Sequence, residues 1–300
     1  MSNFLEFSFE AFSYKLFVPS GYKEGNAVPL MVMLHGCKQT PDDFALGTKM
    51  NKLAEKETFL VLYPAMNYLF NAEGCWNWFL EDNQHRQVGE PAIIAGMIED
   101  VKNNYSVDAR RVYVAGLSAG GAMASIMGAT YPDLFSGVAI CSGLEYSAVD
   151  DAIMAVPDAF HAMANGGPDP YECGIKAFRE MGEHSRKMPV IVFHGICDTT
   201  VHPINALQVI TQWAQTNYLV DGGEGQVNVL ASKVQAGIIN GRSFLQQVYQ
   251  DKNGSPFMEL WLIDGMGHAW SGGDHEGSYT DPLGPDATAI LWDFFKRNTN

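Results

Sequence analysis

A serine set among glycines is the first residue of this sequence whose surroundings indicate chemistry. Ser118 lies in the pentapeptide Gly116-Leu117-Ser118-Ala119-Gly120, which the apolar run Val112–Ala115 precedes and an Ala- and Met-rich stretch follows. A tight strand-to-helix turn needs small neighbours, and it presents the serine hydroxyl at the start of a helix. The pattern therefore predicts that Ser118 is a nucleophile.

A nucleophilic serine needs a histidine base, and after this type of turn the chain order is serine, acid, histidine. His268 fits the base because it lies in a glycine-rich loop just after the apolar run Glu259–Ile263. The alternative bases considered downstream of Ser118 are His184, His194, His202 and His275. Of these, His194 directly ends an apolar run, so we predict a structural role for it.

Asp198 is the predicted acid that orients the histidine. It lies between Ser118 and His268, in the loop that begins where the apolar run Val190–Phe193 ends. The rival carboxylates are Asp133, Asp158, Asp264 and Asp274. Asp133 follows the nucleophile helix and is typical of a cap, whereas Asp264 is close to His268 in sequence but lies on the wrong connection.

Two backbone N–H groups are needed to bind the charge that forms on the substrate oxygen. Ala119, directly after the nucleophile, is expected to supply one of them. Cys37 is the candidate for the other, because the loop His35-Gly36-Cys37 follows the early apolar run Pro29–Leu34. A plain strand-ending turn is the alternative interpretation of this loop.

Continuous apolar runs predict the strands that must position these residues. The runs cover 29–34, 59–63, 112–115, 138–140, 190–193 and 259–263, and helical patterns alternate with them at 41–57, 91–105, 118–130, 205–219 and 287–296. This alternation predicts a mostly parallel sheet with helices on both faces. Residues 4–18 are expected to add two strands.

The length of 300 residues and the hydrophobic content of 47% suit a single catalytic domain over residues 1–300. We expect the segments 64–90, 144–188 and 220–241 to be loop insertions that form a cap or a substrate rim. No separate substrate-binding domain is expected.

The formal net charge of −15 disfavours nucleic acids and anionic membranes as partners. No stretch approaches the ~20 apolar residues that a membrane span needs. The first residues do not resemble a signal peptide, although a chain whose signal was replaced by a start methionine would look the same. No C-x-x-C pair occurs, so no zinc site is expected. The oligomeric state is left open.

Together these segments resemble the polyhydroxybutyrate-depolymerase-type esterases, which are α/β-hydrolases related to feruloyl and acetyl xylan esterases. The matching stretches are His35–Gln39, Cys75–Phe79, Gly89–Pro91, Arg111–Gly121, His194–Val201 and Gly267–Gly273, within about residues 12–296. The resemblance implies a secreted or periplasmic carboxylester hydrolase with the triad Ser118, Asp198 and His268 and with no metal or cofactor. A cytoplasmic location is the alternative.

The resemblance also implies a disulfide between Cys37 and Cys75 beside the site. Cys141 and Cys197 follow successive strands and can pair as well, which would leave Cys173 as the odd thiol. The alternative for all five cysteines is burial as small apolar residues.

Aromatic residues in loops near the site suggest a subsite for an acyl chain or a phenolic ring. They are Trp76, Trp78, Phe79 and Trp270. Packing in the core is the alternative role, because aromatic residues often fill cores.

The expected function is hydrolysis of a polyester or oligoester, such as poly(3-hydroxybutyrate), or of related short-chain esters. Feruloyl or acetyl xylan esterase activity is one alternative, and amide hydrolysis of poly(aspartic acid) is another. The net charge of −15 argues against a polyanionic substrate. An inactive binding module of the same fold is a further alternative, but all three triad positions are filled.

Overall fold

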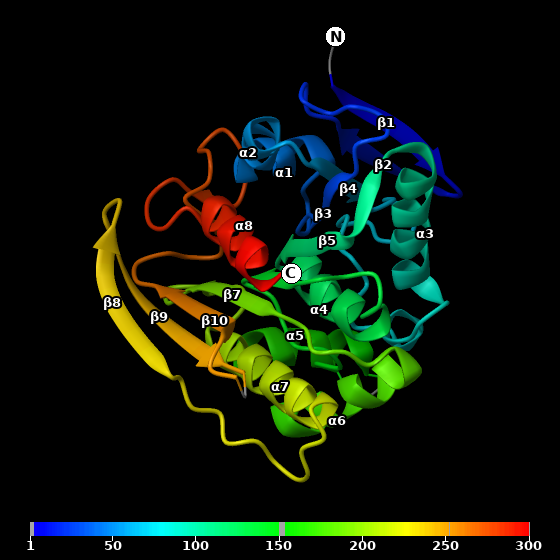
Figure 1. Cartoon of the computed structure of the whole chain (residues 1–300). Helices are drawn as coiled ribbons and strands as arrows, with labels where there is room; N and C mark the ends of the chain where they lie inside the picture. Colours follow the sequence, from blue (N-terminus) through cyan, green and yellow to red (C-terminus); the bar gives the residue numbers. More distant parts are fainter. Residues whose placement is uncertain (1–2, 150–153, 252, 300) are drawn as a thin grey trace.

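A ten-stranded sheet forms the centre of the computed structural model, which describes residues 3–149, 154–251 and 253–299 (Figure 1). Its strand order is β1-β2-β4-β3-β5-β6-β7-β10-β9-β8. The strands are β1 (Phe4–Phe9), β2 (Phe12–Phe17), β3 (Val28–Leu34), β4 (Leu60–Ala65), β5 (Val107–Leu117), β6 (Val138–Cys141), β7 (Val190–Gly195), β8 (Lys233–Ile239), β9 (Arg242–Gln250) and β10 (Pro256–Ile263). A small separate pair joins β11 (Trp270–Ser271) to β12 (Thr280–Asp281).

The six central strands, β4-β3-β5-β6-β7-β10, are parallel, and antiparallel strands extend the sheet at both ends. All seven residues of β3 are buried, as the continuous apolar run requires of a strand covered on both faces. Leu117 at the end of β5 pairs with Cys141 at the end of β6, and Cys141 pairs with Phe193 in β7. The carboxyl ends of these strands therefore meet at one edge of the sheet.

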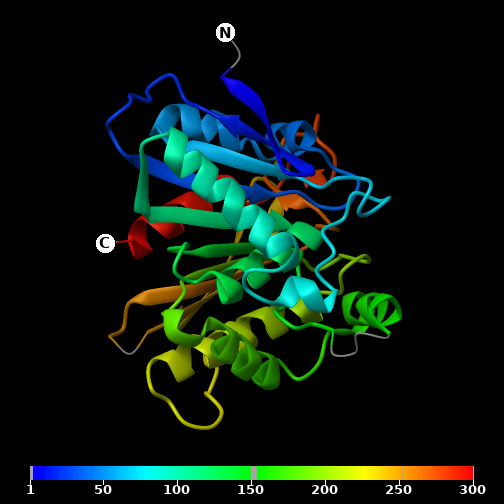
Figure 2. The ribbon, with the colours of Figure 1, turned by 90° about the vertical axis from the view of Figure 1, so that its right-hand side faces the viewer.

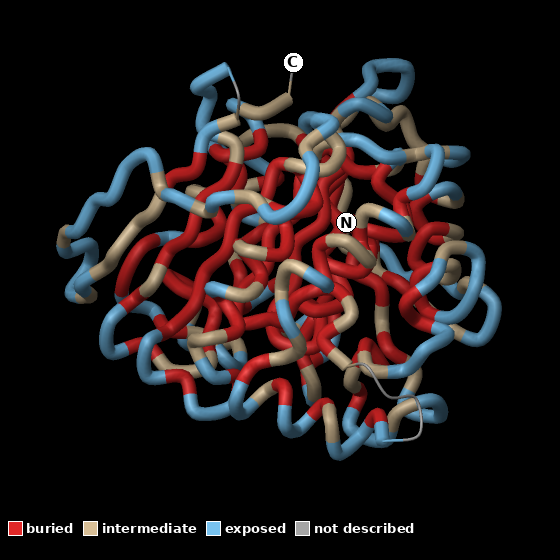
Figure 3. The backbone as a smooth tube through the Cα atoms, turned by 90° about the horizontal axis from the view of Figure 1, so that it is seen from below, coloured by how far each residue is buried: buried red, intermediate tan, exposed pale blue. Residues whose placement is uncertain are grey.

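Helices cover both faces of the sheet, as Figures 1 and 2 show. They are α1 (Pro41–Thr48), α2 (Met50–Glu57), α3 (Gly89–Asn104), α4 (Ala119–Thr130), α5 (Ala155–Asn165), α6 (Pro170–Met181), α7 (Ile204–Val220) and α8 (Ala287–Asn298). One apolar core lies under α1, α2 and α8, and the other lies under α3, α4, α6 and α7. In Figure 3 the central strands are buried and the exposed segments lie at the margin. This arrangement is the α/β-hydrolase fold, so the predicted fold class is confirmed.

Three segments differ from the expectation. The helix predicted over 41–57 is two helices, because Lys49 adopts a left-handed φ of 58° between them. The expected loop insertion 144–188 contains α5 and α6, and 220–241 contains β8. The buried side of α6 repeats at Cys173, Ala177 and Met181, a helical spacing that its polar neighbours obscure.

No helix within the described ranges is long and apolar enough to cross a membrane.

Candidate active site

Ser118 occupies a strained turn between the last residue of β5 and the first residue of α4. Its φ of 60° and ψ of −122° lie in a region that non-glycine residues rarely adopt, and its N–H donates to the Cys141 carbonyl at 2.9 Å. A Cβ at Gly116 would lie 2.1 Å from the Gly120 carbonyl oxygen, and one at Gly120 would lie 2.0 Å from the Leu34 carbonyl oxygen. The glycines around Ser118 are therefore needed for this turn to fit against β3.

Asp198 and His268 lie in loops that follow neighbouring parallel strands, β7 and β10. The His268 Nδ1–H donates to Asp198 Oδ2 at 2.7 Å, which leaves Nε2 as the nitrogen that can accept a proton. Asp198 Oδ1 accepts from the backbone N–H groups of Thr200 at 2.8 Å and Val201 at 2.9 Å. Burial alone would raise the pKa of Asp198, but hydrogen bonds from His194 and His268 outweigh it and hold this pKa well below its usual value.

His194 also contacts the Asp198 carboxylate. Its ring is fully buried, and Nε2 lies 2.8 Å from the Val201 carbonyl oxygen and 3.4 Å from Asp198 Oδ2. Donation from Nε2–H to the carbonyl sets the tautomer and holds the loop that carries Asp198. The sequence indicated only a structural role for His194, and the four-residue spacing to Asp198 was the signal for this contact.

The strand order β5-β6-β7-β10 brings Ser118, Asp198 and His268 to one edge of the sheet. The rival residues lie elsewhere or have other partners. Asp133 forms an ion pair with Arg86 at 2.6 Å, and the His275 side chain is 80% exposed. The catalytic roles of the three residues at the edge remain a prediction, and their placement supports it.

The loop His35–Cys37 packs directly against the Ser118 turn. A Cβ at Gly36 would lie 3.4 Å from the Ser118 Cβ. His35 is buried, and burial lowers its pKa to about 4, so its ring is neutral. Its Nδ1–H donates to the Gly36 carbonyl at 2.8 Å, and its Nε2 accepts from the Met66 N–H at 3.1 Å. This ring fixes the loop in which Cys37 is the predicted oxyanion donor, opposite Ala119.

The structure contains the disulfide Cys37–Cys75, and neither Cys141 nor Cys197 forms a disulfide. The suggested pairing of Cys141 with Cys197 is therefore wrong. The Cys141 side chain lies in the core at the end of β6, whereas Cys197 is exposed in the loop after β7. Cys173 is buried in α6.

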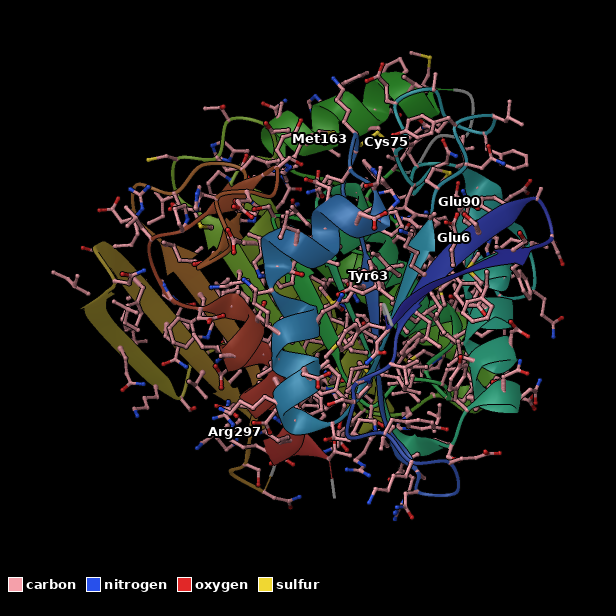
Figure 4. All side chains as sticks on the ribbon, turned by 90° about the horizontal axis from the view of Figure 1, so that it is seen from above. Glu6, Tyr63, Cys75, Glu90, Met163 and Arg297 are labelled. Atoms are coloured by element: carbon pink, nitrogen blue, oxygen red, sulfur yellow. A yellow bond between two sulfur atoms is a disulfide. The ribbon has the colours of Figure 1, made fainter. Side chains whose placement is uncertain are left out.

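A chain of hydrogen bonds connects the disulfide to a buried carboxylate. The Cys75 N–H donates to Asn71 Oδ1 at 3.3 Å, and Asn71 Nδ2 donates to Asn77 Oδ1 at 2.8 Å. Asn77 in turn donates from its backbone N–H at 2.8 Å and from Nδ2 at 2.6 Å to Glu90. Figure 4 labels Cys75 and Glu90 at the two ends of this chain. No sequence pattern predicted this chain of hydrogen bonds, although Cys75 and Glu90 both lie in stretches that match the family.

Glu90 is expected to make the free energy of unfolding fall as pH rises from about 4.5 to about 7. Burial raises the pKa of Glu90 to about 7, against the opposing hydrogen bonds from Asn77. In this window the folded state keeps a proton that the unfolded state has lost, so the contribution of Glu90 is full below the window and is lost across it. The expected loss is about 3 kcal/mol.

Urea denaturation from pH 4 to pH 8 measures this effect. Glu90→Gln should lose less stability than the wild type across the window, and Glu99→Gln, an exposed carboxylate on the same helix, should follow the wild type. Equal slopes for Glu90→Gln and the wild type would contradict the prediction.

Removal of the disulfide is expected to lower the free energy of unfolding by about 2–4 kcal/mol, because it closes a loop with a sequence separation of 38. The double variant Cys37→Ala/Cys75→Ala should show this loss in urea denaturation. It should also show a lower kcat, because the disulfide holds in place the loop whose Cys37 backbone N–H is the predicted oxyanion donor. Cys197→Ser, at the exposed free cysteine, is the control and should behave as the wild type. A reductant should destabilise the wild type but not the double variant. Equal destabilisation of both would show that the disulfide is not the source of the lost stability.

The three tryptophans suggested for substrate binding are buried. Their exposed fractions are 0% for Trp76, 5% for Trp78 and 1% for Trp270. Trp270 packs edge-on against Phe44 and donates from Nε1 to the Thr288 hydroxyl at 3.0 Å. The burial favours core packing, the alternative role, for all three.

Other apolar side chains are exposed in the connections that leave the carboxyl ends of four strands. They are Tyr68, Leu69 and Phe70 after β4, Val156 and Phe160 after β6, Ile196 after β7, and Tyr279 after β10. Leu69 is 91% exposed, and the Tyr279 ring is edge-on to His268 with 6.2 Å between centroids. We call these residues the apolar rim. The apolar rim could not be predicted from the sequence, because single apolar residues in polar segments have no periodicity.

Comparisons with known proteins show which family this chain is similar to. The family described as "Esterase PHB depolymerase" matches residues 12–233. Poly(3-hydroxyalkanoate) depolymerase C of Paucimonas lemoignei is 34% identical over 84% of this chain, which spans 56% of that protein. Feruloyl esterase B of Neurospora crassa is 30% identical over 80% of the chain and 77% of its own length.

Among solved structures, the acetyl xylan esterase from Aspergillus awamori has a TM-score of 0.75 at 21% identity, with 95% of this chain and 94% of that chain covered. At this identity the likeness shows the shared fold. The sequence matches go further, because the family covers most of the chain. The chain belongs to the esterase PHB depolymerase family.

Proposed function

We propose that this protein hydrolyses carboxylic esters through an acyl-enzyme formed on Ser118. The observation that carries the proposal is the 2.7 Å hydrogen bond between His268 and Asp198 at the same sheet edge as the Ser118 turn. Such a pair supplies both the base that activates a serine and the carboxylate that orients the base.

In the proposed mechanism, His268 Nε2 takes the proton of the Ser118 hydroxyl as its oxygen attacks the ester carbonyl carbon. The negative charge on the carbonyl oxygen is bound by the N–H groups of Ala119 and Cys37. The imidazolium then gives its proton to the alcohol that leaves. A water molecule, deprotonated by His268, releases the acid and regenerates Ser118. Asp198 stabilises the imidazolium in both halves of the reaction.

We further propose that the substrate is an uncharged polyester or oligoester such as poly(3-hydroxybutyrate). Two observations favour this substrate over soluble polyanions. The apolar rim lies in four connections that leave the carboxyl ends of the strands, where Tyr279 contacts His268, and the chain carries a net charge of −15 that repels poly(aspartic acid). The names of the relatives include depolymerase, feruloyl esterase and acetylxylan esterase. Feruloyl esters and acetylated xylan are therefore the alternative substrates.

A substrate panel tests the proposal. It contains poly(3-hydroxybutyrate) film, soluble 3-hydroxybutyrate oligomers, p-nitrophenyl butyrate, methyl ferulate, acetylated xylan and polyaspartate. We expect release of 3-hydroxybutyrate products from film and oligomers and turnover of p-nitrophenyl butyrate. Preference for methyl ferulate or acetylated xylan would replace the polyester assignment. No turnover and no fluorophosphonate adduct at Ser118 would identify a binding module instead.

We also propose that the protein works in an oxidising compartment, outside the cytoplasm. The disulfide Cys37–Cys75 supports this location, because disulfides persist where thiols are not kept reduced.

A further inference from the structure

Strand β8 forms an uncovered edge of the sheet. It pairs with β9 on one side and is the last strand in the order, at the margin of Figure 1. Six of its seven residues are exposed, including Val234 at 57% and Ile238 at 75%. A long apolar edge strand presents unpaired backbone N–H and C=O groups and is a template for another strand.

The charge around β8 differs from that of the rest of the chain. Residues 225–250 contain no aspartate or glutamate, although the whole chain carries a net charge of −15. Lys233 and Arg242 are the charged residues of this segment, and Arg242 is paired with Asp281 at 2.8 Å. By contrast, the opposite edge strand β1 carries the exposed carboxylate of Glu6, labelled in Figure 4, and Glu10 follows that strand. Between acidic molecules, β8 is the edge at which close approach costs least.

We propose that β8 pairs with β8 of a second copy of this chain, in antiparallel register about a two-fold axis at Ala236. In this register Val234 lies opposite Ile238 of the second copy, and Ala236 lies opposite its own counterpart. Because side chains alternate along a strand, these three residues share one face. Both copies therefore contribute to one apolar cluster, with cross-strand pairs of the type that stabilises sheets.

The same register also separates the charges of the interface. Lys233 lies opposite Ile239 of the second copy, so the two lysines are at opposite ends of the paired strands. The two lysines are six residue positions apart along the paired strands, a distance of about 20 Å. This distance exceeds the screening length of about 8 Å at physiological salt. The surface is self-complementary and closes as a dimer. Since the two bodies are acidic, association should strengthen as salt rises.

Sedimentation velocity over a wide concentration range tests this pairing. The wild type should dimerise, and Val234→Lys and Ile238→Asp should each weaken the dimer at least about tenfold. The double variant Val234→Lys/Ile238→Asp should recover most of the loss, because each lysine then lies opposite an aspartate of the second copy. Within one chain the two positions are about 13 Å apart, too far to pair.

Ser8→Lys, an exposed residue on the opposite edge strand, is the matched control and should dimerise as the wild type does. Turnover of a small ester checks that every variant is folded. A wild type that stays monomeric throughout, a dimer that survives both single substitutions, a double variant without recovery, or an open-ended series of larger species would each overturn the proposal.

Discussion

Replacing Ser118 by alanine is expected to lower kcat for p-nitrophenyl butyrate by about 10⁶-fold. The loss should be this large because the variant has no atom that can form the acyl-enzyme, although it keeps the loop His35–Cys37 and the Asp198–His268 pair. Alanine fits the turn sterically, so the protein should fold and still bind ester. Initial-rate kinetics with a product assay measure the loss, and circular dichroism verifies the fold.

Ser142 provides the matched control for this experiment. It lies just beyond β6, one strand from Ser118, and its buried hydroxyl has no hydrogen-bond partner among the described residues. Ser142→Ala should keep wild-type turnover and should react with a fluorophosphonate, whereas Ser118→Ala should not. Substantial turnover by Ser118→Ala would refute its assignment as the nucleophile.

Asp198→Asn is expected to lower kcat by about 10⁴-fold with little change in KM. An asparagine can keep its oxygen toward the N–H groups of Thr200 and Val201, but its amide then faces the ring nitrogens of His194 and His268. The His268 ring would turn to the other tautomer and lose the carboxylate that stabilises its charged form. The pH dependence of kcat/KM should therefore change as well.

Asp264 supplies the control for this substitution, because it is exposed and close to His268 in sequence. Asp264→Asn should retain full activity and the wild-type pH profile. Stability gives a second readout. The folded protein holds the pKa of Asp198 below its unfolded value of about 4, so the ionised carboxylate stabilises the protein at neutral pH and this stabilisation is lost as pH falls through the folded pKa. A normal kcat for Asp198→Asn would show that another carboxylate has the role of the acid.

The sequence predicts most of the strands, turns and site residues at the sheet edge that carries the candidate site. Each of these elements has a strong local pattern. The glycines around Ser118 and the continuous apolar runs have a physical meaning that does not depend on distant residues. Chain order then selects Asp198 and His268 from several candidates. In the structure His268 Nδ1 lies 2.7 Å from Asp198 Oδ2, and no local sequence pattern could specify this contact.

The features that the sequence did not predict depend on contacts between distant segments. Glu90 and Asn77 are ordinary polar residues until a turn brings them together in the interior. The disulfide suggested between Cys141 and Cys197 is absent. The order of the strands predicts that both residues lie at the same sheet edge, but it does not predict where their side chains point. The same limit applies to Trp270, which looked accessible in a loop and packs on Phe44 instead.

The disulfide also has a consequence for engineering the selectivity of this protein. The connection after β4 is fixed at both ends, at Met66 by the His35 ring and at Cys75 by the bond to Cys37. Between these anchors Leu69 is 91% exposed, and Tyr68 and Phe70 are each 53% exposed, with the Phe70 ring stacked on Phe12. Segments with fixed ends and exposed tips tolerate sequence changes and insertions. Combinatorial libraries at these three positions can therefore vary the apolar surface of this connection without changing Ser118, Asp198 or His268.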